Sequence, residues 1–257
     1  MSLIPAILDY VGHCPICDKE VRFIAKDAWY RDHLLCMSCR SLPRHRSFFH
    51  VLKQKFPHFR ELKIHESSPL DYVAKAMFGT CRAYSASHYW QNIPSGSERW
   101  GYLKYLSRIR PLSRILPGPL SYVCQDLEHL VFPDESFDLF VTMDVMEHIL
   151  DPSRAWREID RVLKLGGAHI FTVPIFDRPE SIMRAYRNTK GETIHMMPPD
   201  YHGNPLGGGS LVTWEWGRDI VEYVERATGE KTEVYSLQDK RLGILGAMTD
   251  VLVCRKS

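Results

Sequence analysis

The sequence lacks the features that would place it in or across a membrane. No apolar run in its 257 residues approaches the ~20 residues that a membrane-spanning helix needs. The N-terminal stretch MSLIPAILDYVGHCP has no basic segment ahead of its apolar residues, so it does not resemble a secretion signal. We therefore expect a cytoplasmic protein whose thiols stay reduced.

The sequence also has little net charge, so its total charge gives no reason to expect a nucleic-acid partner. The formal net charge is +2. The charge is uneven, however, because residues 1–60 hold ten Lys and Arg against five Asp and Glu, a local excess of about +5. This excess weakly favours an anionic partner near the N-terminus, and a solvated basic face explains it more simply.

Flexible linkers and internal repeats are absent as well. No Gly/Ser-rich or low-complexity segment divides the chain, and its length suits a main domain with an appendage. We expect a small cysteine-rich module over residues 1–46 that runs directly into a main domain over residues 47–257. Residues 94–121 form an apparent insertion in that domain.

Four of the seven cysteines occur as two C-x2-C pairs. Cys14 and Cys17 form the first pair, and Cys36 and Cys39 follow after 18 intervening residues. Two such pairs supply four thiolates in a tetrahedral arrangement, which is typical of a structural Zn²⁺ site without an open position. A disulfide or four incidental cysteines are the alternatives, and a reducing compartment disfavours the disulfide. We expect a zinc-ribbon-like module with a short hairpin between the pairs.

The main body alternates between strand and helix patterns. Helices are predicted at 69–77, 151–167 and 217–229, the second with Asp151 as N-cap and Gly166 as its end. Strands are predicted at 61–68, 82–87, 120–126, 137–144 and 168–175, with a closing antiparallel pair at 231–237 and 249–256. This alternation predicts a doubly wound α/β sheet, which binds its ligands at the carboxyl ends of the strands.

Residues 116–174 carry a resemblance to a known enzyme class. Asp126–Leu127 after a strand, then FPDESFDLFV, EH and RVLKLGG, resemble the core of Rossmann-like S-adenosylmethionine-dependent methyltransferases. The segments CPIC…CMSCRSLPRHR, MMPPDYHGNP and RLGILG resemble a bacterial subgroup with a cysteine-rich N-terminal module. The resemblance covers about residues 60–257 and implies a seven-stranded sheet with S-adenosylmethionine as cofactor.

The resemblance also implies cofactor-binding residues, with one departure from the family. The first loop of the family is usually Gly-rich, whereas this chain has HESSPLD. Ser67, Ser68 and Pro69 are expected to form a tight turn there. The full expected set is Glu66 near the cofactor ammonium, Ser67, Ser68, Ser85, Ser87 in place of a ribose-binding acid, Asp126 and Leu127 at the adenine, and Asp144 near the methyl group.

The stretch FVTMDVMEHILDP places Asp144, Glu147 and His148 together after a buried strand. Three interpretations stay open. The group caps and packs the next helix, His148 is a general base, or the cluster binds a divalent metal together with His202. Methyltransferases of small-RNA 3′ ends and of ubiquinone biosynthesis carry a similar acid-x-x-Glu-His.

Substrate-binding candidates lie in two further regions. The segment ETIHMMPPDYHGNP and the arginines after the second cysteine pair supply His195, Tyr201, His202, Asn204 and Arg44. Residues 98–116 predict a basic amphipathic helix, which is a surface helix, a lid, a dimer contact or a membrane-surface contact.

These features together predict a zinc-containing methyltransferase that acts on an oxygen atom of a small-molecule or sugar-like acceptor. A methyltransferase that modifies RNA, with the zinc module gripping the nucleic acid, is the weaker alternative. A binding protein that has kept the fold without catalysis is another. The sequence does not define the acceptor or the oligomeric state, because fold does not fix function.

Overall fold

A six-stranded mixed sheet forms the centre of this computed structural model, which describes residues 7–69, 71–89, 124–203 and 209–257. The strand order is β14–β15–β7–β6–β4–β5. The strands are β4 (Lys63–Ser67), β5 (Ala83–Ser87), β6 (Phe137–Met143), β7 (Leu163–Thr172), β14 (Thr232–Tyr235) and β15 (Val251–Arg255). Strands β4 to β7 are parallel, and β15 runs antiparallel to β7 and β14. The predicted doubly wound α/β architecture is confirmed.

The seventh predicted strand, at residues 120–126, lies mostly outside the described residues. Its Cys124 makes a parallel bridge with His88, immediately after β5. A strand in this position would join the sheet beside β5.

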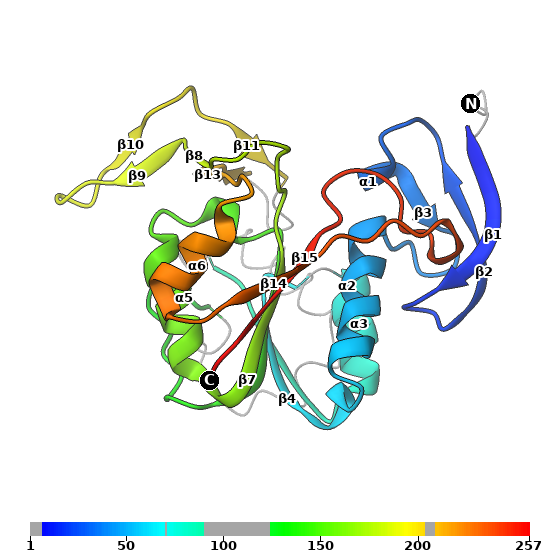
Figure 1. Cartoon of the computed structure of the whole chain (residues 1–257), viewed down its shortest axis with the longest axis horizontal. Helices are drawn as coiled ribbons and strands as arrows, with labels where there is room; N and C mark the ends of the chain where they lie inside the picture. Colours follow the sequence, from blue (N-terminus) through cyan, green and yellow to red (C-terminus); the bar gives the residue numbers. More distant parts are fainter. Residues whose placement is uncertain (1–6, 70, 90–123, 204–208) are drawn as a thin grey trace, which may run out of the picture.

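Helices cover both faces of the sheet (Figure 1). α2 (Pro43–Lys55) and α3 (Asp71–Thr80) lie on one side, and α5 (Pro152–Val162) and α6 (Ile220–Thr228) on the other. Because successive strand residues point to opposite faces, β7 contributes Ile170 to one core and Phe171 to the other. Each face of the sheet is therefore buried against helices.

One predicted helix ends earlier than expected. α5 ends at Val162 rather than at Gly166, and β7 begins at once with Leu163. Gly166 has a φ of 77°, and a Cβ at Gly167 would lie 2.9 Å from the carbonyl oxygen of Asp138. The two glycines instead serve an irregularity in the β6–β7 register, Gly166 through its positive φ and Gly167 through its closeness to the neighbouring strand.

The N-terminal module is a three-stranded antiparallel sheet. It consists of β1 (Leu8–Cys14), β2 (Lys19–Ala25) and β3 (Leu34–Cys36), with the short helix α1 (Tyr30–His33) before β3. The hairpin expected between the cysteine pairs is present with a third strand added. The proposed boundary after residue 46 falls inside α2, so one helix serves both the module and the main domain.

Three two-stranded ribbons follow β7 in the chain (Figure 1). They pair β8 (Ile182–Met183) with β13 (Trp214–Glu215), β9 (Ala185–Arg187) with β10 (Thr193–His195), and β11 (Tyr201–His202) with β12 (Ser210–Leu211). Among the helices formed by the described residues, none has the length and apolar character required to cross a bilayer.

The connection between β14 and β15 reaches back to the N-terminal module (Figure 1). It contains the turn η5 (Lys240–Leu242), followed by Gly243 with a φ of 67°. A Cβ at Gly243 would lie 2.7 Å from the ring of Phe23 and 2.9 Å from the Nε atom of Arg46. Gly243 is therefore required both by its backbone conformation and by the space available.

We expect Gly243→Ala to destabilise the protein more than Gly229→Ala does. Both glycines have positive φ, but a Cβ at Gly229 would meet nothing within 4 Å. Gly229→Ala should cost about 1 kcal/mol from backbone strain, and Gly243→Ala a further ~1–3 kcal/mol from overpacking. Urea unfolding of the two variants measures the difference, and equal losses would contradict the packing argument.

Candidate functional site

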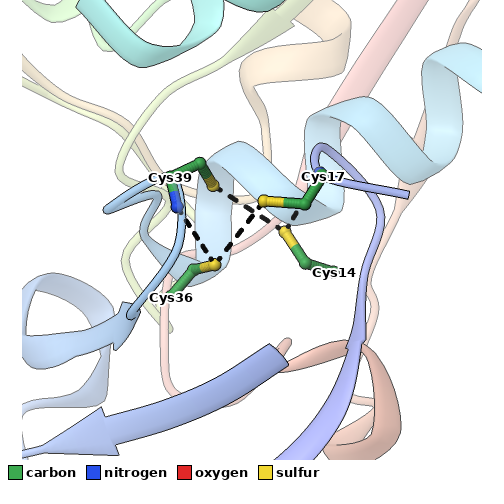
Figure 2. Close-up of side chains that lie close together, drawn as sticks. All are labelled: Cys14, Cys17, Cys36 and Cys39. Atoms are coloured by element: carbon green, nitrogen blue, oxygen red, sulfur yellow. Dashed lines mark hydrogen bonds between the residues drawn. The ribbon is translucent and has the colours of Figure 1, made fainter. Parts of the chain in front are cut away.

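The four cysteines of the two C-x2-C pairs form one cluster (Figure 2). The sulfurs of Cys14 and Cys39 are 3.9 Å apart, and those of Cys17 and Cys36 are 3.8 Å apart. Four sulfurs at ~2.3 Å from a tetrahedral zinc ion lie about 3.8 Å from one another. The same separations are far too long for a disulfide bond. The geometry therefore fits a Zn²⁺ ion with four thiolate ligands.

Both cysteine pairs are built on the same turn. Asp18 and Arg40 each follow the second cysteine of a pair, and both have a left-handed backbone, with φ of 56° and 63°. Each donates its N–H to the carbonyl oxygen of the first cysteine at 2.8 Å. The amides of Cys17 and Cys39 point at the first sulfur of their own pair, at 3.5 Å. Two equivalent turns with amides directed at sulfur are typical of metal-binding knuckles.

A buried arginine lies beside this cluster. Arg46 has no exposed surface and donates to the carbonyl oxygens of Leu34, Ser41 and Gly243. Burial lowers the pKa of Arg46 to about 10, while the nearby thiolates of Cys14 and Cys36 act in the opposite direction. The oxygens that accept its hydrogen bonds are neutral, so the thiolates of the cysteine cluster are the anions that would offset its charge. A Zn(Cys)4 centre with net charge −2 suits this requirement.

Asp144 begins the candidate site at the end of β6. Its carboxylate lies 3.0 Å from Nη2 of Arg31 and 2.7 Å from Nε of Arg44, and it accepts from the hydroxyl of Thr172 at 3.1 Å. Burial would raise the pKa of Asp144, but the charges of Arg44 and Arg31 hold it below its usual value. Asp144 is therefore an ionised, paired carboxylate.

Glu147 differs from Asp144 in having no such partner. Its side chain is 3% exposed, and neither carboxyl oxygen makes a hydrogen bond among the described residues. Burial and the charge of Asp144 raise the pKa of Glu147 well above that of an ordinary glutamate. An unpartnered buried carboxyl group costs about 1–3 kcal/mol or more, which marks the position as one that a ligand or ion would satisfy.

His148 and His202 lie beside Glu147. Nδ1 of His148 lies 2.9 Å from the carbonyl oxygen of Leu211, to which it donates, so Nε2 carries the lone pair. This Nε2 is 3.9 Å from Oε1 of Glu147, and the rings of His148 and His202 meet edge to face at 5.3 Å. Glu147, His148 and His202 each offer a ligand atom within 4.8 Å of the others. The β11–β12 ribbon supplies both His202 and the carbonyl of Leu211.

The structure gives Glu147 and His148 no capping role, and the interpretation that they pack the next helix stays a prediction. Glu147 and His148 lie in the turn η4 (Met146–His148), and α5 begins only at Pro152. The N-cap of α5 is Asp151, as predicted, whose carboxylate accepts from the amide of Arg154 at 3.0 Å. The helix therefore needs neither Glu147 nor His148 for its first turn.

The turn after β4 takes a conformation usually reserved for glycine. Ser68 has a φ of 54° and donates its N–H to the carbonyl oxygen of Ser87 at 2.7 Å. Ser67 is buried at the end of the strand, and buried Glu66 accepts from the hydroxyl of Tyr84. The loop without glycine thus still forms the tight turn that the resemblance implies at the cofactor edge.

Ser85 and Ser87 point elsewhere than expected. Their hydroxyls lie 2.9 Å from the two ring nitrogens of His65, which is fully buried and whose pKa burial lowers to about 3. Both hydroxyl groups therefore form hydrogen bonds with a neutral histidine inside the sheet. Their role as ribose ligands rests on the resemblance alone.

Asp126 and Leu127 lie in a turn just beyond the Cys124 bridge. The Asp126 carboxylate accepts from the amide of Glu128 at 2.9 Å and lies 3.6 Å from His129. Its side chain is one-third exposed, whereas Leu127 is buried. An accessible acid beside a buried apolar side chain is the arrangement expected around an adenine.

The substrate candidates are scattered. Tyr201 and His195 are exposed on β11 and β10, and Asn204 and residues 98–116 lie outside the described residues. Arg44 is 13% exposed and pairs with Asp32 as well as Asp144, so it is engaged within the protein. Arg31 and Thr172 were not anticipated, because no local motif marks a partner more than 25 residues away in the sequence.

Comparison with known proteins agrees with this geometry. Residues 103–171 match the family described as methyltransferase domain. Over this stretch the chain is similar to methyltransferase domains. The matched segment of this domain includes β6, η4 and α5, and therefore Asp144, Glu147 and His148.

Two curated relatives match this chain over short stretches. A ubiquinone/menaquinone biosynthesis C-methyltransferase from Vibrio vulnificus is 32% identical over 84 residues, or 32% of this chain and 30% of the relative. A ubiquinone biosynthesis O-methyltransferase from Coxiella burnetii is 34% identical over 53 residues, or 21% of this chain and 23% of the relative. The chain thus spans about a third of the length of such relatives or less.

One solved structure shares the fold over most of the chain. It is the YcgJ protein from Bacillus subtilis, with a TM-score of 0.50 and 12% identity, covering 83% of this chain and 99% of that protein. At this identity the likeness concerns the fold alone.

We expect purified protein to contain about one zinc ion per chain, held by the four-cysteine cluster. Elemental analysis should find it in the parent and in a Cys124→Ser control, but not in Cys36→Ser Cys39→Ser. The double variant should also unfold at lower temperature, because metal binding contributes to folding. A zinc-free parent prepared without chelator would refute the assignment.

Proposed function

We propose that this chain is an S-adenosylmethionine-dependent methyltransferase that methylates an oxygen atom of a small-molecule or sugar-like acceptor. The observation that carries the proposal is the group formed by Glu147, His148 and His202, next to the carboxyl end of β6 in a methyltransferase domain. Ligands of doubly wound sheets bind at this edge.

The cofactor is proposed to lie over the turn after β4. Glu66, Ser67 and Ser68 would face its methionine part, and Asp126 and Leu127 its adenine. The left-handed turn at Ser68 supports this placement, since it lets the backbone approach a ligand as a glycine loop does. When bound, the cofactor supplies an activated methyl group on a sulfonium, so the protein has only to align and deprotonate the acceptor.

His148 is the residue best suited to take the acceptor proton. Burial lowers the pKa of His148 below the usual value for histidine, so the ring is neutral at pH 7. The hydrogen bond from Nδ1 to Leu211 leaves the lone pair on Nε2, which faces Glu147 and not the sheet interior. A hydroxyl group that meets Nε2 would lose its proton as the new bond to carbon forms.

A divalent metal ion at the same group is the other interpretation. Nε2 of His148, a carboxyl oxygen of Glu147 and a ring nitrogen of His202 form a donor set that suits Mg, Mn, Fe or Zn. The unpartnered oxygens of Glu147 favour it. Asp144, which we had included among the ligands, is instead paired with Arg31 and Arg44. Such an ion would orient an acceptor oxygen and ease its deprotonation.

A small-molecule acceptor is supported by the names of the relatives, which act in quinone biosynthesis by C- and O-methylation. An RNA acceptor is less well supported. Three of the ten basic residues that gave residues 1–60 their positive excess are Arg31, Arg44 and Arg46, and all three are largely buried. The surface of the module is thus less basic than its composition indicates, whereas RNA grips rely on exposed charge.

We expect the parent to bind S-adenosylhomocysteine in isothermal titration, and Asp126→Ala to weaken that binding about tenfold. Asp177→Ala, which removes an acid that is 89% exposed, serves as the control and should bind like the parent. Equal affinity in parent and Asp126→Ala would place the adenine elsewhere. A parent that binds no cofactor product would favour a non-catalytic binding protein.

We expect His148→Ala to lower methyl transfer by about 10²- to 10⁴-fold while cofactor affinity stays near normal. His58→Ala, at an exposed position before the turn η1 (Phe59–Glu61), is the control. Calorimetric titration with Mn²⁺ separates the two interpretations. Binding that disappears in Glu147→Gln and in His202→Ala supports the metal, and no binding in the parent supports the base. Full activity of His148→Ala would exclude both.

A further inference from the structure

Two arginines of the cysteine module end at the candidate site rather than at the protein surface. Arg31 lies in α1, between the two cysteine pairs, and Arg44 lies at the start of α2, shortly after Cys39. Their guanidinium groups are 3.0 and 2.7 Å from the carboxylate of Asp144, and their side chains are only 10% and 13% exposed. The module thus reaches the sheet edge that carries Glu147.

Contacts within the module hold both arginines in place. Arg44 donates to the carbonyl oxygen of Arg31 at 3.2 Å and to Oδ1 of Asp32 at 2.5 Å. Asp32 also accepts from the indole N–H of Trp29 at 2.7 Å. The helix α1 that carries Arg31 and Asp32 continues without a gap into β3, which ends at Cys36. Both arginines therefore lie on segments that lead directly to or from the second cysteine pair.

The charges of this contact are balanced. Arg31 and Arg44 each meet both Asp32 and Asp144, which gives two guanidinium groups and two carboxylates. No positive charge is left over to attract a phosphate or another anionic ligand. The arrangement instead suits two arginines that hold a carboxylate in a fixed place.

Asp144 in turn fixes the backbone that leads to Glu147 and His148. It has a left-handed φ of 52°, which is strained for a residue with a side chain. Its N–H donates to the carbonyl oxygen of Thr172 at 2.9 Å, and its carboxylate accepts from the Thr172 hydroxyl. The arginines and Thr172 thus hold Asp144 from two sides, immediately before η4.

We propose that Arg31 and Arg44 are positioning residues through which the cysteine module sets the geometry of the Glu147–His148 turn. The catalytic role of the Glu147–His148 turn rests on the proposed function, but the contact of the two arginines with Asp144 does not. The module then acts on the site as well as on stability. Loss of its metal loosens residues 143–149 and weakens binding of the cofactor product.

Hydrogen exchange of the full-length, zinc-loaded protein tests this. In Arg44→Met, amides of residues 143–149 should exchange about tenfold faster than in the parent, while β7 stays protected. Arg22→Met is the matched control, because Arg22 pairs with Asp9 on the exposed surface of the same module. It should exchange like the parent. Arg44→Lys keeps the charge without the planar fork, so its exchange should be intermediate.

Affinity for S-adenosylhomocysteine provides a second measurement. It should fall about tenfold in Arg44→Met and remain unchanged in Arg22→Met. A parent that does not bind the compound would refute the proposed function, and the exchange data would still decide the positioning role. Similarly, chelation of the module's zinc should accelerate exchange at residues 143–149.

Parent-like exchange at residues 143–149 in zinc-loaded Arg31→Met Arg44→Met would overturn the proposal. If Arg44→Met instead accelerates exchange throughout the sheet, the milder Arg44→Lys variant decides whether Arg44 has the positioning role. Acceleration confined to residues 143–149 supports the positioning role, and exchange equal to that of the parent overturns it.

Discussion

The pairing of Asp144 with two arginines is the interaction on which the rest of the site depends. A carboxylate at the end of a buried strand is costly unless it is paired, and removal of its partners typically costs about 3–5 kcal/mol. Here the partners come from the N-terminal module, at least 100 residues away in the sequence. The same contact stabilises a strained turn and leaves Glu147, three residues later, as the unpartnered acid. Two neighbouring carboxyl groups thus differ sharply, since Asp144 is paired and Glu147 has no hydrogen-bond partner among the described residues.

Internal pairing also accounts for several of the basic residues near the N-terminus. Composition alone makes this region look like a surface for an anionic partner, but the structure uses three arginines internally. Arg31 and Arg44 neutralise acids at the sheet edge, and Arg46 offsets the negative charge of the thiolate cluster. Charge counted along a sequence predicts a partner only when it reaches the surface, and an arginine is buried only where the fold supplies partners for its charge, as it does here.

Much of the fold could be predicted from periodicity, and much less of the site. The strands at 61–68 and 137–144 and the helix from Asp151 were predicted because local patterns define them. The end of α5 was placed wrongly because the glycines that seemed to stop a helix serve a register shift against β6, a property of the neighbouring strand. Ser85 and Ser87 were predicted as cofactor ligands from the resemblance. Their hydrogen bonds to His65 could not be predicted, because they depend on the pairing of β4 with β5. Contacts between residues that are distant in the sequence leave no pattern in the sequence around either residue.

The carbonyl oxygen of Gly243 accepts two hydrogen bonds from Arg46, across 197 residues of sequence. During synthesis the cysteine module is made before this acceptor, which lies 197 residues after Arg46. A nascent module that has captured its metal therefore still contains a buried guanidinium without its full set of acceptors. The hydrogen bonds of Arg46 are therefore completed only when the β14–β15 connection has been made, so the module depends for its closure on a segment far along the chain.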